Sequence, residues 1–178
     1  MTQMLEALAI ARRQADVRML ILGRVEKAYQ AQYDQLVARH GLADAIEGPK
    51  WIKYNLLGQE VARAQIGIVA MQPTPNNYGS LSNKIYSYMA CGHATVVPKG
   101  SATSDLVLGE QAGIAVDTTN PEAIAEAFVR LAKDPDLRSQ LGANGRRAIM
   151  EKYGWHKMEE RLLDIYAQLE RELQQTHP

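Results

Sequence analysis

Short runs of mainly hydrophobic residues alternate along the chain with longer segments in which hydrophobic residues recur every three or four positions. The short runs are typical of buried strands, and they occupy residues 17–23, 45–47, 66–71, 94–98 and 113–116. The periodic segments are typical of helices, and they occupy residues 2–14, 25–40, 54–64, 83–91, 101–110, 121–133, 134–153 and the stretch from Trp155 onwards. Because strands that alternate with helices pair in parallel through helical crossovers, the sequence predicts an α/β fold with a parallel sheet and helices on both of its faces.

Proline, glycine and asparagine mark the boundaries between these elements. Gly41 and Gly92 stand where helices end, and Asn120-Pro121-Glu122 combines a capping side chain, a proline for the first helical position and an acid near the positive helix end. Residues 72–82 (QPTPNNYGSLS) are rich in Pro, Asn, Gly and Ser, which predicts a loop, and Gly48-Pro49 predicts a turn.

One domain with a helical extension accounts for the length of 178 residues. We expect residues 1–153 to form the domain and residues 154–178 to form a C-terminal helix. Hydrophobic residues recur along one side of that helix, at Trp155, Met158, Leu162, Ile165, Tyr166, Leu169 and Leu173. Because such a stripe is normally buried, we expect it to pack back on the domain or against a partner.

The amino-acid composition argues against several classes of function but does not identify one. The chain has 20 Lys+Arg and 20 Asp+Glu, so its net charge is zero, which argues against a nucleic-acid binder and leaves at most peripheral contact with a membrane. No hydrophobic run approaches the roughly 20 residues of a membrane span, and the N-terminal stretch has charges inside its hydrophobic part, unlike a signal peptide, so we expect a cytoplasmic protein. A single cysteine and the absence of zinc-site spacing lead us to expect no metal.

The region between the strand at 66–71 and the helix at 83–91 is the strongest candidate for a ligand site. In an open parallel sheet, ligands bind at the carboxyl ends of the strands. A helix that begins there presents unpaired N–H groups and a partial positive charge, which suit a diphosphate. Lys84 adds a full positive charge in the first turn, and Asn83 is expected at the start of the helix.

The segment SNKIYSYMACGHATVVP, residues 82–98, resembles the donor-binding signature of the retaining glycosyltransferases of the GT-B fold, the glycosyl transferases group 1 family. That signature places a lysine, a Tyr-Met-Ala triplet and a glycine at the same spacings, followed closely by a Val-Val pair. Residues 112–169 resemble the last part of the same family, from a glycine-led strand to a Tyr-x-Trp motif and a long final helix. The resemblance covers nearly the whole chain and implies half of a GT-B fold, with a Rossmann-like sheet and a helical C-terminal extension.

The resemblance implies the nucleotide-sugar-binding part of a glycosyltransferase, which moves a sugar from a nucleoside diphosphate sugar to an acceptor with retention of configuration. It implies no metal or other cofactor, and it assigns no catalytic residue within this chain. Gly23 and Arg24 are expected to face the donor cleft. The other expected donor-site residues are Gly79, Ser80, Leu81 and Ser82 for backbone N–H groups, Asn83 and Lys84 for the first helical turn, Ser87 for the ribose, and Pro49 and Trp51 for the base.

The chain departs from the family pattern at two positions eight residues apart, where Gly79 and Ser87 stand in place of glutamates. Hydrogen bonds to a charged acceptor contribute about 1.5–3 kcal/mol, against about 0.5–1.5 kcal/mol for neutral ones, so a serine weakens ribose binding without abolishing it. These departures support an alternative, a degenerate glycosyltransferase-like module that binds or interacts without catalysis.

Family members also carry an acceptor domain and one further donor-domain strand ahead of the region that corresponds to residue 1. The resemblance places that strand at the centre of the sheet, between the strands at 17–23 and 66–71. We therefore expect either that these two strands close the gap between them, or that a partner chain supplies the strand.

Overall fold

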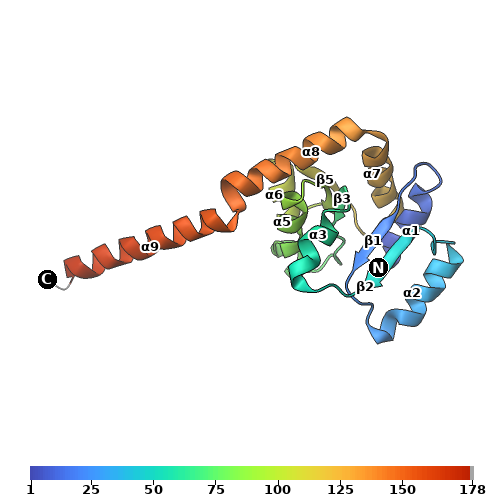
Figure 1. Ribbon diagram of the computed structural model, residues 1–178, viewed down its shortest axis with the longest axis horizontal. Coiled ribbons are helices and arrows are strands. Elements are labelled where there is room, and N and C mark those ends of the chain that lie inside the picture. The colour runs from blue at the N-terminus through green and yellow to red at the C-terminus, as the bar shows by residue number, and fades with distance from the viewer. Residues whose placement is uncertain (177–178) are drawn as a thin grey trace.

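The order of helices and strands follows the sequence prediction almost element by element (Figure 1). The computed structural model describes residues 1–176. The strands are β1 (Met19–Leu22), β2 (Ile46–Lys50), β3 (Ile66–Ile68), β4 (Ala94–Pro98) and β5 (Gly113–Val116). The helices are α1 (Thr2–Ala11), α2 (Lys27–Arg39), α3 (Leu57–Val61), α4 (Pro75–Gly79), α5 (Asn83–Ala90), α6 (Ala102–Gly109), α7 (Pro121–Lys133), α8 (Pro135–Ala148) and α9 (Trp155–Thr176), with a 3-10 turn, η1 (Tyr54–Leu56), and a π-helical turn, η2 (Ile149–Tyr153).

Side-chain caps explain why two helices begin where the sequence indicated. The Asn120 side chain accepts hydrogen bonds from the N–H groups of Glu122 and Ala123, at 2.9 and 3.2 Å, at the start of α7. The Asp134 side chain accepts from the N–H of Leu137 at 2.9 Å at the start of α8. Each cap satisfies donors that the first helical turn leaves unpaired, and this fixes the boundary.

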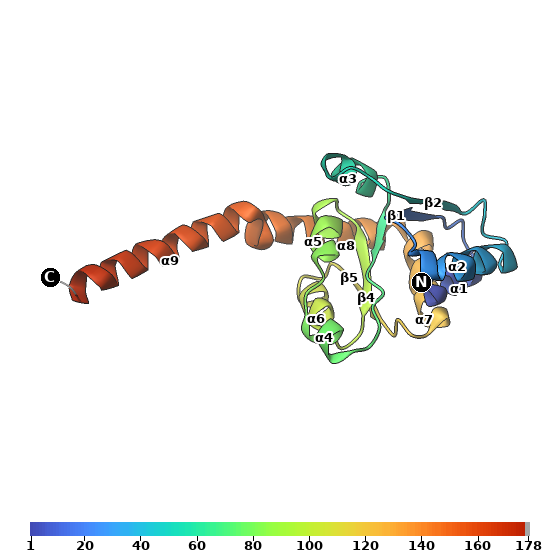
Figure 2. The ribbon, with the colours of Figure 1, turned by 90° about the horizontal axis from the view of Figure 1, so that it is seen from below.

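Helices cover both faces of the β3–β4–β5 sheet, which confirms the predicted α/β architecture (Figure 2). All five residues of the central strand β4 are buried. On one face Val96 packs towards α1 and α7, in a core cluster with Ala7 and Phe128. On the other face Val97 packs towards α5 and α6, in a second cluster that contains Met89.

The strands form two parallel sheets instead of one. β1 pairs with β2, and β3, β4 and β5 pair in that order, while β1 and β3 belong to different sheets. The two sheets are turned relative to each other (Figure 2). A cavity of about 690 Å³ lies between them, lined by residues of both β1 and β3. β1 and β3 therefore do not close the gap between them, which was one of the two alternatives expected from the sequence.

Two local predictions are wrong. Residues 72–82 are not all loop, because Pro75–Gly79 form α4, where Thr74 Oγ1 accepts a hydrogen bond from the N–H of Asn77 at 3.3 Å. Gly48-Pro49, joined by a cis peptide bond, lies inside β2 instead of in a turn. In both cases a proline occupies a position that needs no N–H donor, in the first turn of α4 and in the irregular part of the β1–β2 ladder.

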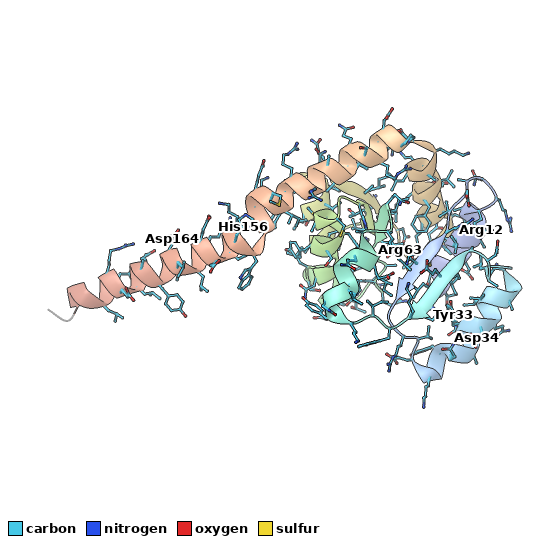
Figure 3. All side chains as sticks on the ribbon, in the orientation of Figure 1. Arg12, Tyr33, Asp34, Arg63, His156 and Asp164 are labelled. Carbon is cyan, nitrogen blue, oxygen red and sulfur yellow. The ribbon has the colours of Figure 1, made fainter. Side chains whose placement is uncertain are left out.

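The final helix projects away from the domain (Figures 1 and 3), and His156 and Asp164 lie on the projecting part. Every residue from Glu159 to Leu173 is exposed, including the hydrophobic ones of the predicted stripe. α9 therefore does not pack back on the domain. Of the two expectations for its hydrophobic stripe, packing against a partner remains. His177 and Pro178 of the predicted segment lie outside the described residues. Among residues 1–176, no helix combines the length and the hydrophobicity needed to cross a membrane.

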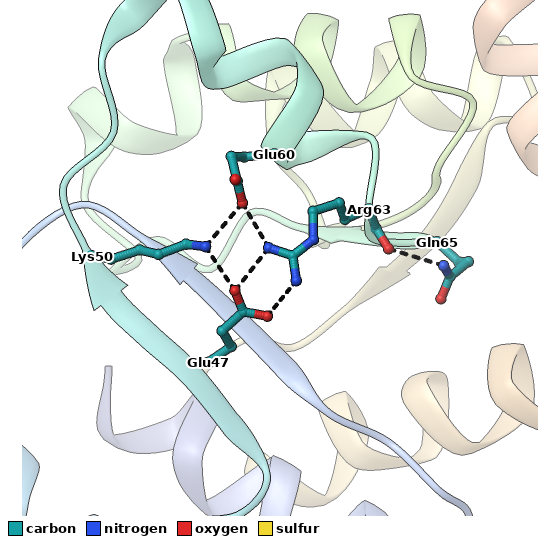
Figure 4. Close-up of polar contacts among 5 residues, drawn as sticks. All are labelled: Glu47, Lys50, Glu60, Arg63 and Gln65. Carbon is teal, nitrogen blue, oxygen red and sulfur yellow. Dashed lines mark hydrogen bonds and ion pairs between the residues drawn. The ribbon is translucent and has the colours of Figure 1, made fainter.

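Four charged side chains connect β2 to α3 and to the segment that leads into β3 (Figure 4). Arg63 reaches Glu47 at 2.6 and 2.7 Å and Glu60 at 2.7 Å, and Lys50 reaches the same two carboxylates at 2.7 and 2.9 Å. Hydrogen bonds from Arg63 and Lys50 lower the pKa of Glu47 from 4.5 to about 2, and those from Lys50 and Arg63 lower the pKa of Glu60. The network thus fixes α3 and the segment that leads into β3 against β2.

This network should make stability sensitive to acid. The pKa of Glu47 is about 2 in the folded state and 4.5 without its partners, so Glu47 stabilises the fold above pH 4.5 and loses that effect as the pH falls through 2. We expect Glu47→Gln to be less stable than the wild type at neutral pH, and to lose less further stability on acidification across that range. Urea unfolding midpoints measure this, with Glu126→Gln, at an exposed position of α7, as the control. Equal acid sensitivity of all three proteins would contradict the expectation.

Candidate functional site

The loop that precedes α5 is held in place by α6. The N–H of Ser82 donates to Thr103 Oγ1 at 3.3 Å, and Thr103 Oγ1 donates to the carbonyl of Ser80 at 3.4 Å. Thr103 is fully buried, so a single hydroxyl fixes both ends of this turn out of reach of water. α5 then begins at Asn83 with Ser82 at the cap position, in agreement with the predicted helix start.

The first turn of α5 presents its donors outwards. The carbonyl of Ser82 accepts the N–H of Ile85 at 3.0 Å, and the N–H groups of Asn83 and Lys84 have no partner among residues 1–176. Both of these residues are exposed, and no acidic residue occupies the turn. Two unpaired donors, the positive end of a helix and an ammonium group together favour an anion.

The other predicted residues of this region lie next to that turn. Gly79 ends α4, and Ser80 and Leu81 form the exposed link to α5. Ser87 follows Asn83 by one helical turn, and its side chain is exposed. The Ser87 hydroxyl is thus accessible on the helix whose N-terminus presents the free donors.

A second group of predicted residues lies at the carboxyl ends of β1 and β2. The N–H of Gly23 donates to the carbonyl of Lys50 at 2.8 Å, which places Arg24 next to the end of β2. The guanidinium of Arg24 lies 5.9 Å from the ring centroid of Trp51, and Trp51 keeps 60% of its surface exposed. Pro49 lies within β2, two residues before Trp51. An exposed indole beside a guanidinium offers a planar, positively charged surface.

The structure does not bring the two groups into contact. No hydrogen bond, ion pair or ring contact joins them in the part of the chain that is described. They lie at the carboxyl ends of strands in different sheets, on either side of the gap. Two cavities, of about 690 and 370 Å³, are lined by other residues, the first in the gap and the second against β5.

Among the described residues, neither a metal-binding cluster nor a catalytic histidine lies at the candidate site. The described residues contain no cluster of three or more His, Cys, Asp or Glu side chains that could hold a metal. His93 is 1% exposed at the start of β4, where its ring stacks on that of Tyr88 with centroids 5.7 Å apart. Burial lowers the pKa of His93, so its ring is neutral at neutral pH. The candidate site lies at the opposite ends of the strands, out of its reach.

Two threonines that the sequence analysis did not single out position the loops at this edge of the sheet. Thr103 holds the turn before α5, and Thr118 Oγ1 donates to the carbonyl of Met71 at 3.2 Å, which ties the loop after β5 to the loop after β3. Both are buried. A hydroxyl residue shortly after a predicted strand end is the sequence signal that could have identified them, because loops from separate strands meet at that edge of the sheet.

Known proteins resemble this chain over most of its length. A family model described as "Glycosyl transferases group 1" matches residues 1–134. The D-inositol 3-phosphate glycosyltransferase of Xylanimonas cellulosilytica is 26% identical over 155 residues, which are 86% of this chain and 36% of that protein.

Two solved structures share the fold. Sucrose-phosphate synthase from Thermosynechococcus elongatus matches with a TM-score of 0.77 at 22% identity, over 94% of this chain and 42% of that one. HepE from Anabaena, in complex with UDP and glucose, matches with a TM-score of 0.77 at 15% identity, over 93% of this chain and 44% of that one. The chain thus spans less than half the length of each of these proteins. Its sheets and helices have the arrangement found in GT-B glycosyltransferases, and because the family model matches most of its length, the chain belongs to the glycosyl transferases group 1 family.

Proposed function

We propose that residues 1–153 are the nucleotide-sugar-binding part of a glycosyltransferase that transfers the sugar of a nucleoside diphosphate sugar to an acceptor with retention of configuration. The observation that carries the proposal is the start of α5, where two unpaired N–H groups and Lys84 present positive charge at the carboxyl edge of a parallel sheet. The presence of UDP and glucose in the HepE structure supports a ligand of this chemistry.

In the proposed arrangement the diphosphate lies at the start of α5. Negative charge develops on the leaving nucleoside diphosphate in the transition state, and the fixed donors of Asn83 and Lys84 stabilise it there. The Ser87 hydroxyl binds the ribose, and Trp51 with Arg24 provides the surface for the base. The proposal needs no metal or other cofactor, and it assigns acceptor binding to a partner chain or an acceptor domain.

A second candidate function is a module that binds without catalysis. It rests on Gly79 and Ser87, which stand where the family resemblance implies glutamates. It also fits the separation of the two groups of candidate residues by a gap in the sheet.

Calorimetric titration with UDP, GDP, ADP and their glucose conjugates tests the first proposal. We expect one nucleotide to bind saturably, and Lys84→Ala to weaken it about tenfold, or about 1.4 kcal/mol, through loss of one charge-assisted contact. Lys133→Ala removes an exposed lysine from the far end of α7 and should leave the affinity unchanged.

Thr103→Val is the complementary variant, because it removes the hydroxyl that holds Ser80 and Ser82 and leaves Lys84 in place. Its nucleotide affinity should also fall, while circular dichroism shows a folded protein. Absence of binding at millimolar nucleotide in a folded sample would contradict a donor site in this chain and would favour the second candidate.

A further inference from the structure

The outer edge of the β3–β4–β5 sheet is formed by β5, which pairs with β4 on one side only. The carbonyl of Val116, the last residue of β5, accepts the N–H of Lys99 at 2.8 Å. Successive residues of a strand direct their N–H and C=O groups to opposite sides. Gly113 and Ala115 therefore direct theirs away from β4, towards the outside of the sheet.

A groove of about 370 Å³ runs along this outer edge, and Gly113–Ala115 line it. Hydrophobic side chains form its other walls, with Leu108 from α6 and Leu137 and Leu141 from α8. Leu108 keeps 51% of its surface exposed, although it belongs to a helix that covers the sheet. Unpaired backbone groups and accessible hydrophobic side chains thus face the same groove.

Two positively charged side chains complete the lining, Lys99 and Arg130. Both are exposed, and neither side chain has a hydrogen-bond or ion-pair partner in the part of the chain that the structure describes. No acidic side chain of the described residues lines the groove. Asp117, which follows β5, accepts hydrogen bonds from the N–H and the hydroxyl of Thr119, at 2.9 and 2.6 Å. The charge of the groove itself is therefore positive.

The two cations stand at opposite ends of the groove. Lys99 is bonded to Val116, at the carboxyl end of β5. α8 crosses the amino ends of the strands, because a Cβ on Gly142 would overlap the carbonyl of Gly92, in the turn that leads into β4. Arg130 lies in the last turn of α7, just before α8 begins, and so belongs to the amino end of β5.

We propose that this groove binds an extended acidic segment of a partner protein, which pairs with β5 as an added strand and places carboxylates at Lys99 and Arg130. The backbone groups of Gly113 and Ala115 bond to its main chain, and the leucines of the walls contact hydrophobic side chains at its centre. None of the predicted donor-site residues lines the groove, so the inference does not depend on nucleotide binding.

The same charges argue against a second copy of this chain as the occupant. If two β5 edges met in antiparallel pairing, Lys99 of one copy would face Arg130 of the other, and in parallel pairing each cation would face its own counterpart. Like charges opposite each other destabilise a strand pair, and cations beside an edge strand discourage such self-pairing. An acidic segment meets attraction at both ends of the groove.

Residue-resolved amide exchange, measured with and without a synthetic peptide, tests this proposal. The probe has three central valine and isoleucine residues with two glutamates on each side. At saturation we expect exchange at Gly113 and Ala115 to slow about tenfold or more, because these amides become hydrogen-bonded. The amide of Thr95, already bonded to the carbonyl of Ala112 at 3.1 Å, is the internal reference.

Variants with reversed charge separate recognition of the acids from adhesion of the hydrophobic centre. Lys99→Glu and Arg130→Glu should each weaken the glutamate peptide about fivefold, and the double variant should instead prefer a peptide with lysines in place of the glutamates. Arg39→Glu, at an exposed position in the last turn of α2, is the matched control and should leave the affinity unchanged. A glutamate peptide with prolines in its centre lacks N–H donors and should not slow exchange.

Four results would overturn the proposal. They are unchanged exchange at millimolar glutamate peptide, equal binding of the lysine peptide by the wild type, and equal protection by the proline peptide. The fourth is slow exchange at Gly113 and Ala115 in the free protein together with a dimer mass in sedimentation, which would assign this edge to a second copy of the chain.

Discussion

Met89→Ala should lower the free energy of unfolding by about 2–5 kcal/mol, the range for truncating a fully buried methionine. Met89 has no exposed surface, and it lies between the sheet and α8 in a cluster with Ile85 and Val97. Gly145 of α8 approaches it so closely that a Cβ there would lie 3.1 Å from Met89 Cγ. Because α8 packs directly on this side chain, the surroundings cannot collapse fully into the space that truncation leaves.

Met150→Ala is the matched control, since it makes the same chemical change at a residue that is 59% exposed. Its cost should be about 0.5 kcal/mol or less. Urea unfolding followed by circular dichroism gives both values. Losses of similar size in the two variants would show that Met89 is not a closely packed part of the core.

Gly142→Ala should destabilise the protein by about 1–3 kcal/mol through overpacking. Gly142 is buried in α8, and an added Cβ would overlap the carbonyl oxygen of Gly92 in the turn between α5 and β4. Both partners are backbone, so neither can move aside as the end of a side chain would. This cost outweighs the gain of about 1 kcal/mol that alanine brings over glycine inside a helix.

Gly109→Ala, near the end of α6, should have the opposite sign. A Cβ there meets no atom within 4 Å, so only the helix preference remains and the variant should be as stable as the wild type or more so. Thermal unfolding of both variants measures the comparison. A stabilised Gly142→Ala would show that α8 does not lie against the Gly92 turn as described.

Local signals were sufficient for much of the fold. The strands at 94–98 and 113–116 and the helix from Pro121 to Lys133 match their predicted bounds, because continuous hydrophobic runs and a capped Asn-Pro start depend only on neighbouring residues. The helix at Pro75 and the strand through Pro49 were missed, since proline marks a break only when its position needs an N–H donor.

The arrangement of the sheets and of the site depends on contacts between distant segments, which periodicity does not encode. The sequence indicated a helix start at Asn83, but not that Thr103, about twenty positions later, holds the preceding turn. It suggested Arg24 and Trp51 separately, and only the structure shows the guanidinium of Arg24 over the ring of Trp51. The roles of all these residues in binding a donor stay predictions until the titrations are made.

The projecting helix α9 is a long arm that is attached to the domain at one end only. Its 22 residues, at about 1.5 Å each, make an arm about 33 Å long. The arm joins the body at Gly154, where the backbone leaves the helical conformation for a single extended residue. A change of direction of about 10° at that joint displaces the far end by about 6 Å. If a partner binds the hydrophobic side of this arm, small backbone rotations at Gly154 would change the orientation of the domain relative to that partner.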